Sequence, residues 1–292
     1  LAQIVTFTAD LASEVRSRAR LLDDLRRAFE SRQLHLAYQP QIDLASNRVV
    51  GAEALLRWRL ADGTMVPPAT FIPIAEQSGL IIDLGRWLLH EAMQALQRLR
   101  AASAPDLRLA INVSAVELRR PDFADGICRA LRDMEIPANA LEIEITESLA
   151  VGTSEPTIES LAALRASGVT VAIDDFGTGY SSLAYLDRLP ADRLKIDRSF
   201  IATLEHDARA ARIPRTIIAL GRELGLRIVA EGVEQQSVAD ARGRIHRLAG
   251  GPPASQRLSG GESLVARRPH CKTGHGRERV RKHRSLPAHG IS

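Results

Sequence analysis

The sequence predicts an α/β fold, a barrel of the (β/α)₈ kind whose last β/α unit is not accounted for. Apolar, strand-like runs alternate with helical runs from residue 107 to residue 231, which is typical of parallel strands joined by helical crossovers. Seven strands can be counted before residue 235. Most of these strands end on an ionisable or amide side chain. An open doubly wound sheet is the structural alternative.

The elements follow from hydrophobic periodicity. An amphipathic helix is expected around residues 21–29, and alternation predicts strands at 35–40 and 48–58 with a turn between them. Helices are expected at 69–77 and 82–100. The remaining expected elements are strand 107–113, helix 121–134, strand 141–146, helix 155–166, strand 169–174, strand 192–196, helix 207–224 and strand 226–231.

Length and composition indicate a globular protein. The chain has 292 residues, of which 45% are hydrophobic and 25% charged, and no apolar run approaches the roughly 20 residues that span a bilayer. The first residues carry neither an initiator Met nor a signal peptide, so we expect the chain to begin inside a longer protein. Two scattered cysteines predict neither a disulfide framework nor a metal site, and dispersed histidines disfavour zinc. The expected location is cytoplasmic, with the chain free or as the cytoplasmic part of a membrane-anchored protein.

The segment from about residue 241 to 292 differs from the rest. From residue 242 it contains no Phe, Tyr, Trp or Met and carries a net charge of +10, whereas the preceding part carries −6. Such a segment buries too little apolar surface to offset its ordering entropy, so we expect a disordered basic tail. The tail lacks interleaved aromatic residues, so specific nucleic-acid binding is not expected.

Polar groups at the strand ends predict the chemistry. They are Glu53, Asn112, Glu144, the pair Asp174 and Asp175, Lys195 and Glu231. In a barrel the carboxyl ends of the parallel strands meet at one face, so these groups converge. Clustered carboxylate and amide oxygens suit Mg²⁺ or Mn²⁺, and phosphate esters are the natural substrates of such sites.

The pair Asp174 and Asp175 is the strongest of these signals. Adjacent residues of a strand point to opposite faces, so each carboxylate can serve one of two metals. Gly177 and Gly179 follow in a tight loop. A plain turn with a helix cap needs one Asp after a buried strand and not two.

The other groups have structural alternatives. Glu53 and Arg57 share a strand face and could form a cross-strand ion pair, although Arg57 also suits bidentate phosphate contact. Asn112 matches a glycosylation pattern and could also be a metal ligand or a helix cap. Glu147 fits a capping box. Lys195 alone could be a surface charge.

Taken together, these motifs resemble the EAL family, the cyclic di-GMP phosphodiesterases of bacteria. The resemblance covers about residues 30 to 236. It rests on Glu53-Ala54-Leu55, Asn112-Val113-Ser114, Glu144-Ile145-Thr146-Glu147, Asp174-Asp175-Phe176-Gly177-Thr178-Gly179-Tyr180-Ser181 and Glu231-Gly232-Val233-Glu234. It implies a modified (β/α)₈ TIM-type barrel with an antiparallel first strand over residues 31–240. Residues 1–30 resemble the linker helix that follows an upstream GGDEF domain.

The resemblance also implies residue roles. One metal would be held by Glu53, Asn112, Glu144 and Asp174, and the second by Asp175. Glu231 would bind or orient at the metal pair, and Lys195 would hold the attacking water. The dinucleotide would contact Gln39, Leu56 and Arg57, while Glu147 would hold the loop at 175–182, which in the family couples dimerisation to metal binding.

The implied reaction is hydrolysis of cyclic di-GMP to linear pGpG with Mg²⁺ or Mn²⁺, in a homodimer, with Ca²⁺ inhibitory. After Gln236 the chain departs from the family, because no Gln-Gly-aromatic triplet follows. A frameshift near residue 240 would explain the change, and it predicts two unpaired barrel edges at the strands of residues 35–40 and 226–231. The working enzyme therefore has an alternative, a non-catalytic cyclic di-GMP receptor or an inactive remnant.

Overall fold

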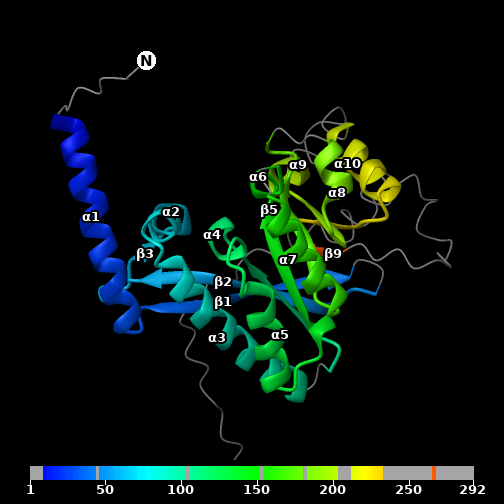
Figure 1. The fold of residues 1–292 in the computed structure, drawn as a ribbon, viewed down its shortest axis with the longest axis horizontal. Coiled ribbons are helices and arrows are strands. Elements are labelled where there is room, and N and C mark those ends of the chain that lie inside the picture. Colours follow the sequence, from blue (N-terminus) through cyan, green and yellow to red (C-terminus); the bar gives the residue numbers. More distant parts are fainter. Residues whose placement is uncertain are drawn as a thin grey trace, which may run out of the picture.

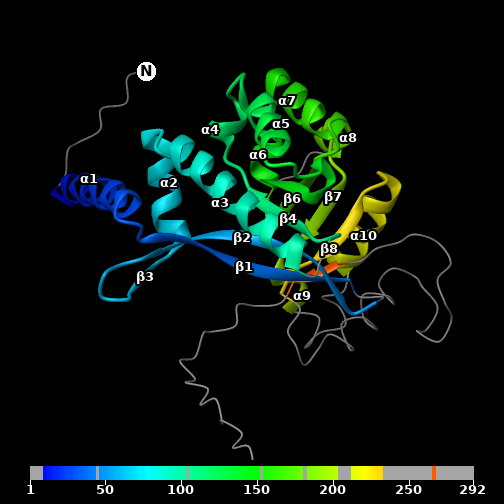
Figure 2. The ribbon, with the colours of Figure 1, turned by 90° about the horizontal axis from the view of Figure 1, so that it is seen from below.

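The computed structural model describes residues 9–43, 46–102, 105–151, 154–179, 183–202, 212–232 and 265–267. Within these residues the chain forms one curled sheet with helices around it (Figures 1 and 2). The expected α/β barrel is confirmed. The predictions for the basic segment from residue 241 onward lie outside the described residues, apart from the short strand at 265–267.

The strands follow the order β1-β9-β8-β7-β6-β5-β4-β2-β3, and β1 also pairs with β2. Strand β1 is antiparallel to β2, while β2, β4, β5, β6, β7 and β8 run parallel to one another. The strands are β1 Leu34–Asp43, β2 Arg48–Arg59, β3 Met65–Val66, β4 Arg108–Asn112, β5 Leu141–Thr146, β6 Thr170–Phe176, β7 Arg193–Ile196, β8 Arg227–Ala230 and β9 Val265–Arg267. The antiparallel first strand agrees with the expected modified barrel.

Helices lie along the outside of the sheet. The longer ones are α1 Ala9–Glu30, α2 Pro68–Ser78, α3 Ile81–Ala102, α5 Phe123–Asp133, α7 Glu155–Ala166 and α10 Arg212–Glu223. Short helical pieces are α4 Ala115–Leu118, η1 Ala138–Ala140, α6 Glu147–Val151, α8 Leu183–Arg188 and α9 Arg198–Ala202. The sequence did not predict the short pieces or β3, since they are too brief for hydrophobic periodicity. No helix in the described part of the chain is long and apolar enough to cross a membrane.

The core fills the space between the sheet and its helices. Strands buried on both faces, such as β5 and β6, read as nearly continuous apolar runs interrupted by a few buried acids. Trp58 of β2 packs edge-on against Phe71 of α2, with ring centroids 5.6 Å apart. The apolar face of α3 contributes Leu84, Leu88 and other buried residues. The buried strands hold the polar groups at their ends in fixed positions.

The expectation of an unpaired edge at residues 226–231 is wrong, whereas β9 does not pair with residues 35–40, because its partners in β1 are Gln41, Ile42 and Asp43. Strand β9 pairs in parallel with β8 and antiparallel with β1, so it occupies the gap between them. Ala266, for example, has Ala230 on one side and Ile42 on the other. Backbone hydrogen bonding requires no side-chain pattern, which is why a three-residue strand escaped the sequence analysis.

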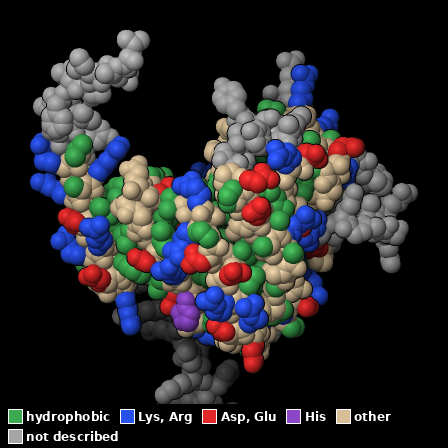
Figure 3. Space-filling model, in the orientation of Figure 1, with side chains coloured by type: hydrophobic (Ala, Val, Ile, Leu, Met, Phe, Trp, Pro, Cys, Tyr) green, Lys and Arg blue, Asp and Glu red, His purple; other side chains and the backbone are tan. Residues whose placement is uncertain are grey.

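The amino-terminal helix α1 projects from the barrel (Figures 1 and 2). Its last turns are anchored by Leu25 and Ala28, which are fully buried. Further towards the start, residues 15–20 are exposed, and Figure 3 shows Lys and Arg side chains along this helix. Whether α1 connects to an upstream domain stays a prediction.

Candidate metal centre

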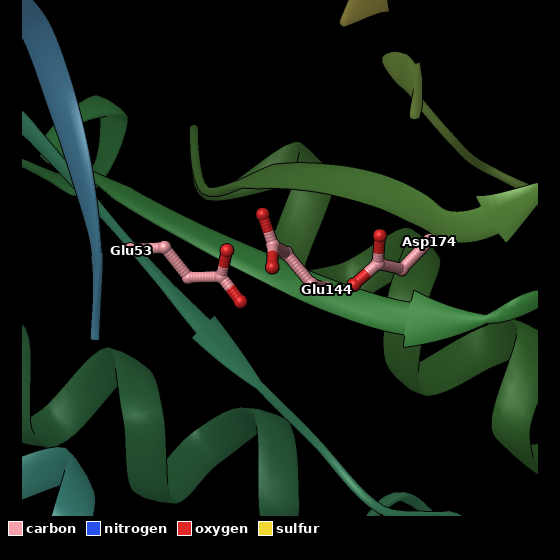
Figure 4. A group of neighbouring side chains, drawn as sticks. All are labelled: Glu53, Glu144 and Asp174. Carbon is pink, nitrogen blue, oxygen red and sulfur yellow. The ribbon is translucent and has the colours of Figure 1, made fainter. Parts of the chain in front are cut away.

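Three carboxylates from three strands converge at the carboxyl end of the barrel. Glu53 of β2, Glu144 of β5 and Asp174 of β6 each offer an oxygen within 4.8 Å of the others (Figure 4). All three side chains are buried. Parallel strands in register bring these three side chains together, as the sequence analysis expected.

A second group shares Asp174. It consists of Asp174, Asp175 and Glu231, which also offer oxygens within 4.8 Å of one another. Asp175 is exposed beside the buried Asp174. The backbone of Asp175 has a φ of 52°, in the left-handed region that Asp and Asn tolerate better than most residues. Its amide donates to the Asp174 carboxylate at 2.9 Å.

Lys195 lies among these carboxylates. Its Nζ is 2.7 Å from Glu144 Oε2, 2.5 Å from Asp174 Oδ1 and 3.2 Å from Glu231 Oε1, and the side chain is fully buried. Burial would lower the pKa of this lysine, but attraction by Glu144, Asp174 and Glu231 outweighs burial and raises it. Lys195 therefore stays protonated at any physiological pH.

One lysine cannot neutralise five carboxylates. Burial raises the pKa of Glu144 well above its ordinary value, with Asp174 adding to the rise and Lys195 opposing it. Burial also raises the pKa of Glu231 to about 8 and raises that of Asp175, again with help from Asp174. Ionising all of these carboxylates together is therefore unfavourable with Lys195 as the neighbouring cation, and divalent cations would supply the positive charge that favours their ionised forms.

Asn112 lies at the end of β4, next to Glu53. Its Nδ2 donates to Glu53 Oε1 at 2.6 Å. Because the amide nitrogen faces Glu53, the amide oxygen of Asn112 is a further candidate metal ligand. The helix cap after this strand is Ser114, whose hydroxyl accepts from Glu117 N while the Glu117 carboxylate accepts from Ser114 N. Ser114, and not Asn112, is therefore the residue that caps this helix.

Glu147 lies at the start of α6, and its carboxylate faces the loop after β6. Oε2 accepts from Gly177 N at 2.7 Å and from Gly179 N at 3.4 Å. Gly177 has a φ of 99°, and a Cβ there would approach the Phe200 ring to 2.8 Å. The start of the loop is therefore held by Glu147, and residues 180–182 lie outside the described part.

The expected substrate residues lie on β1 and β2. Gln39 is directly opposite Glu53 in the antiparallel pair, which places both on the same face. Arg57 is half-buried four residues beyond Glu53, and its Nη1 donates to the Leu56 carbonyl at 2.8 Å. Burial lowers the pKa of Arg57, although the group remains a cation.

The sequence analysis missed a charged layer below the metal centre. Arg193 Nη1 lies 2.7 Å from Glu142 Oε2, and both side chains are almost completely buried. Glu142 precedes Glu144 by two residues and Arg193 precedes Lys195 by two, so each pair shares a strand face. This two-residue spacing was the available signal.

The family comparison agrees with this geometry. The EAL domain family matches residues 22–244. The chain belongs to the EAL domain family.

Relatives in this family include named signalling proteins of Pseudomonas aeruginosa. The bifunctional diguanylate cyclase/cyclic di-GMP phosphodiesterase MucR is 42% identical over 231 residues, which is 79% of this chain and 34% of MucR. The cyclic di-GMP phosphodiesterase NbdA is 42% identical over 228 residues, covering 78% of this chain and 29% of NbdA. The chain spans about a third of the length of the curated relatives it matches.

Solved structures show the same fold. The P. aeruginosa MucR phosphodiesterase in complex with c-di-GMP has a TM-score of 0.73 at 41% identity, and the match covers 85% of this chain and 94% of that one. The EAL domain of Mycobacterium smegmatis DcpA has a TM-score of 0.62 at 36% identity, covering 80% of this chain and 90% of that one.

Proposed function

We propose that this EAL domain hydrolyses one phosphodiester bond of cyclic di-GMP to give linear pGpG, with Mg²⁺ or Mn²⁺. One observation carries the proposal: five carboxylates gather around a single buried ammonium at the carboxyl end of the barrel. The cyclic di-GMP phosphodiesterases among its relatives support the choice of substrate.

The donor set fits two hard divalent cations. We assign Glu53, Asn112, Glu144 and Asp174 to one of them and Asp175 to the other, with Glu231 serving or orienting the pair. Carboxylate and amide oxygens are the ligands that Mg²⁺ and Mn²⁺ prefer. When bound, the two cations would lower the pKa of a water and balance charge on the phosphoryl oxygens.

The protein's own groups orient the reaction. Lys195 would hold the attacking water and keep its oxygen aimed at phosphorus. Its Nζ contacts Glu144, Asp174 and Glu231, so a contact with the water would replace one of these three. The water oxygen forms a bond to phosphorus while the bond from phosphorus to the 3′ oxygen breaks. The water gives up its proton, and the leaving 3′ oxygen gains one.

Residues of β1 and β2 would hold the substrate. The Arg57 guanidinium can contact a phosphate, with Gln39 and Leu56 against the rest of the dinucleotide. Glu147 would keep the loop after β6 in place for the second cation. Ca²⁺ is expected to inhibit, since it is larger and less strict in geometry than Mg²⁺. A homodimer formed through the barrel and an upstream domain joined by α1 belong to the same proposal.

Turnover by the purified chain tests the proposal. The chain is incubated with cyclic di-GMP and Mn²⁺, and pGpG is followed by chromatography. We expect product from the wild type, and a loss of at least about a hundredfold in Glu53→Gln, because one metal ligand is weakened. Glu159→Gln, an exposed substitution on α7, is the matched control and should keep full activity.

The receptor alternative predicts a different outcome. Binding of cyclic di-GMP without release of pGpG, at any Mn²⁺ or Mg²⁺ concentration, would reject the enzyme in favour of a receptor. Equal activity in Glu53→Gln and Glu159→Gln would remove Glu53 from the centre.

A further inference from the structure

A pocket lies at the end of the barrel opposite the metal centre, where the parallel strands begin. Its volume is about 440 Å³. Arg108, Thr170 and Arg227 are the first residues of β4, β6 and β8, which places the pocket at the amino-terminal mouth. Arg100 of α3, Asp106 and Asn139 complete the polar lining.

The lining is predominantly basic. Three guanidinium groups, from Arg100, Arg108 and Arg227, face one lining carboxylate, that of Asp106. Arg100 is held in place, since its Nη1 donates to the Leu107 carbonyl at 2.9 Å. The arrangement is therefore a positive concavity whose cations come from three separate elements.

A buried ion pair lies behind the pocket. Glu142 contacts Arg193 and also attracts Arg108, so one carboxylate serves two guanidinium groups. Burial lowers the pKa of Arg193 to about 10, against the attraction of Glu142, and repulsion from Arg108 and Arg227 contributes to the drop. Asp43 also attracts Arg108. Asp43, Glu142 and Asp106 together balance only part of the charge of the four arginines at this mouth.

Arg108 also has an unused donor. Its Nε is buried, and among the described residues it makes no hydrogen bond. Arg108 lines the pocket. Buried N–H groups normally have a partner, so this donor favours an acceptor that enters the pocket from outside the chain.

We propose that the amino-terminal mouth of the barrel, lined by Arg100, Arg108 and Arg227, binds the phosphate group of a small molecule. A guanidinium fork matches two phosphate oxygens, and phosphate carries enough acceptor oxygens for several donors at once. Thr170 and Asn139 add a hydroxyl and an amide. A carboxylate would satisfy fewer of these donors.

This site is separate from the metal centre. The cations of the metal centre would bind at the carboxyl ends of the strands, whereas Arg108 and Arg227 stand at the amino ends. The proposal does not rest on phosphodiesterase activity. A catalytically inactive chain would still bind phosphate here.

Calorimetric titration with inorganic phosphate tests the site. The full chain is kept in EDTA, so that the carboxylate cluster holds no cation, and ionic strength is fixed with NaCl. We expect saturable binding of one phosphate. Arg227→Met should weaken it about tenfold or more, since hydrogen bonds to charged groups are worth that much. Arg227 is exposed, so this variant should keep its fold.

Three further variants locate the binding. Arg108→Met should weaken phosphate as Arg227→Met does, although Arg108 is half-buried and its stability must be checked by circular dichroism. Arg20→Met removes the same charge from the exposed part of α1 and should change nothing. Arg57→Met should also change nothing, because Arg57 lies towards the other mouth. Absence of saturable binding, an equal loss in Arg20→Met, or a loss in Arg57→Met alone would overturn the proposal.

Discussion

The two mouths of this barrel use the same strands for opposite charges. Near the carboxyl end, Glu144 of β5 meets Lys195 of β7 at 2.7 Å, and two residues earlier Glu142 meets Arg193 at the same distance. Glu144 and Lys195 belong to what we call the upper layer, where the acids outnumber the bases because Asp174 and Glu231 also contact the lysine. Glu142 and Arg193 belong to the lower layer, where the arginines outnumber the acids.

The opposite charge excess of the two layers indicates which kind of ligand each layer binds. A buried ion pair is a weak source of stability, because desolvation cancels much of the attraction. A buried group of charges with an excess of one sign destabilises the fold further, so we expect it where a bound ligand of the opposite charge compensates it. The upper layer then calls for cations and the lower layer for an anion. The type of basic residue in each layer agrees with this assignment. Lysine carries a compact point charge, whereas the planar guanidinium of arginine presents several donors in a fixed geometry that suits an anion.

The largest test of this comparison removes one base from each layer. Lys195→Met and Arg193→Met should each lower the free energy of unfolding by about 3–5 kcal/mol in EDTA, because buried carboxylates lose their partner. Adding Mn²⁺ should restore much of the stability of Lys195→Met, since cations replace the ammonium charge. In Arg193→Met, Mn²⁺ should raise the free energy of unfolding by no more than it does in the wild type. Urea unfolding followed by circular dichroism measures both.

An equal response of the two variants to Mn²⁺ would contradict the comparison. A double variant, Glu142→Leu with Arg193→Met, serves as the control for the lower layer. It should recover most of the loss, because removing both partners leaves no buried charge unpaired.

The sequence predicted the upper layer well because its residues follow long apolar strands. Glu144 and Asp174 follow residues that are buried in β5 and β6, so topology places them in the barrel. Glu53 differs, because it lies in the middle of β2 and the run before it includes the exposed Val49. The antiparallel β1 and the parallel order of the later strands also agreed with expectation. Periodicity and strand ends thus provided most of the fold.

The lower layer escaped for a physical reason. Glu142 lies inside a strand where a buried acid is unfavourable by itself, and only the spatial neighbour Arg193 makes it tolerable. That neighbour is 51 positions away along the chain. Ala172 of β6 lies in register beside both Glu144 and Arg193, and its small side chain leaves room for these contacts. The strand β9 escaped likewise, since backbone pairing leaves no side-chain signature.

A smaller test asks how many cations the upper layer holds. Asp175→Asn should reduce the number of Mn²⁺ ions bound from two to one, because Asp175 is assigned to the second cation only. The fold should persist, since Asn tolerates the left-handed φ of 52° at this position. Electron paramagnetic resonance counts free and bound Mn²⁺. Asp125→Asn, an exposed change on α5, is the control, and two bound ions in Asp175→Asn would refute the assignment.

The smallest test concerns a buried acid that belongs to neither layer. Glu117 faces Gly85 of α3, where a Cβ would come within 1.7 Å of its Oε1, and its hydrogen bonds come from Ser114. Burial raises the pKa of this carboxyl, against the hydrogen bonds from Ser114. Its contribution to stability is therefore complete below the unfolded pKa and is lost as pH rises through the raised folded pKa.

Glu117→Gln separates burial from charge. At pH 4 the variant should differ from the wild type by less than about 1 kcal/mol, because Gln keeps an acceptor for Ser114 N. As pH rises towards 8, the wild type should lose stability relative to the variant, which does not ionise. Thermal unfolding in EDTA from pH 4 to 8 measures the gap, with the exposed Glu159→Gln as a control that stays flat. A difference between the two proteins that stays constant from pH 4 to pH 8 would mean that the hydrogen bonds from Ser114 compensate the buried charge of Glu117 fully.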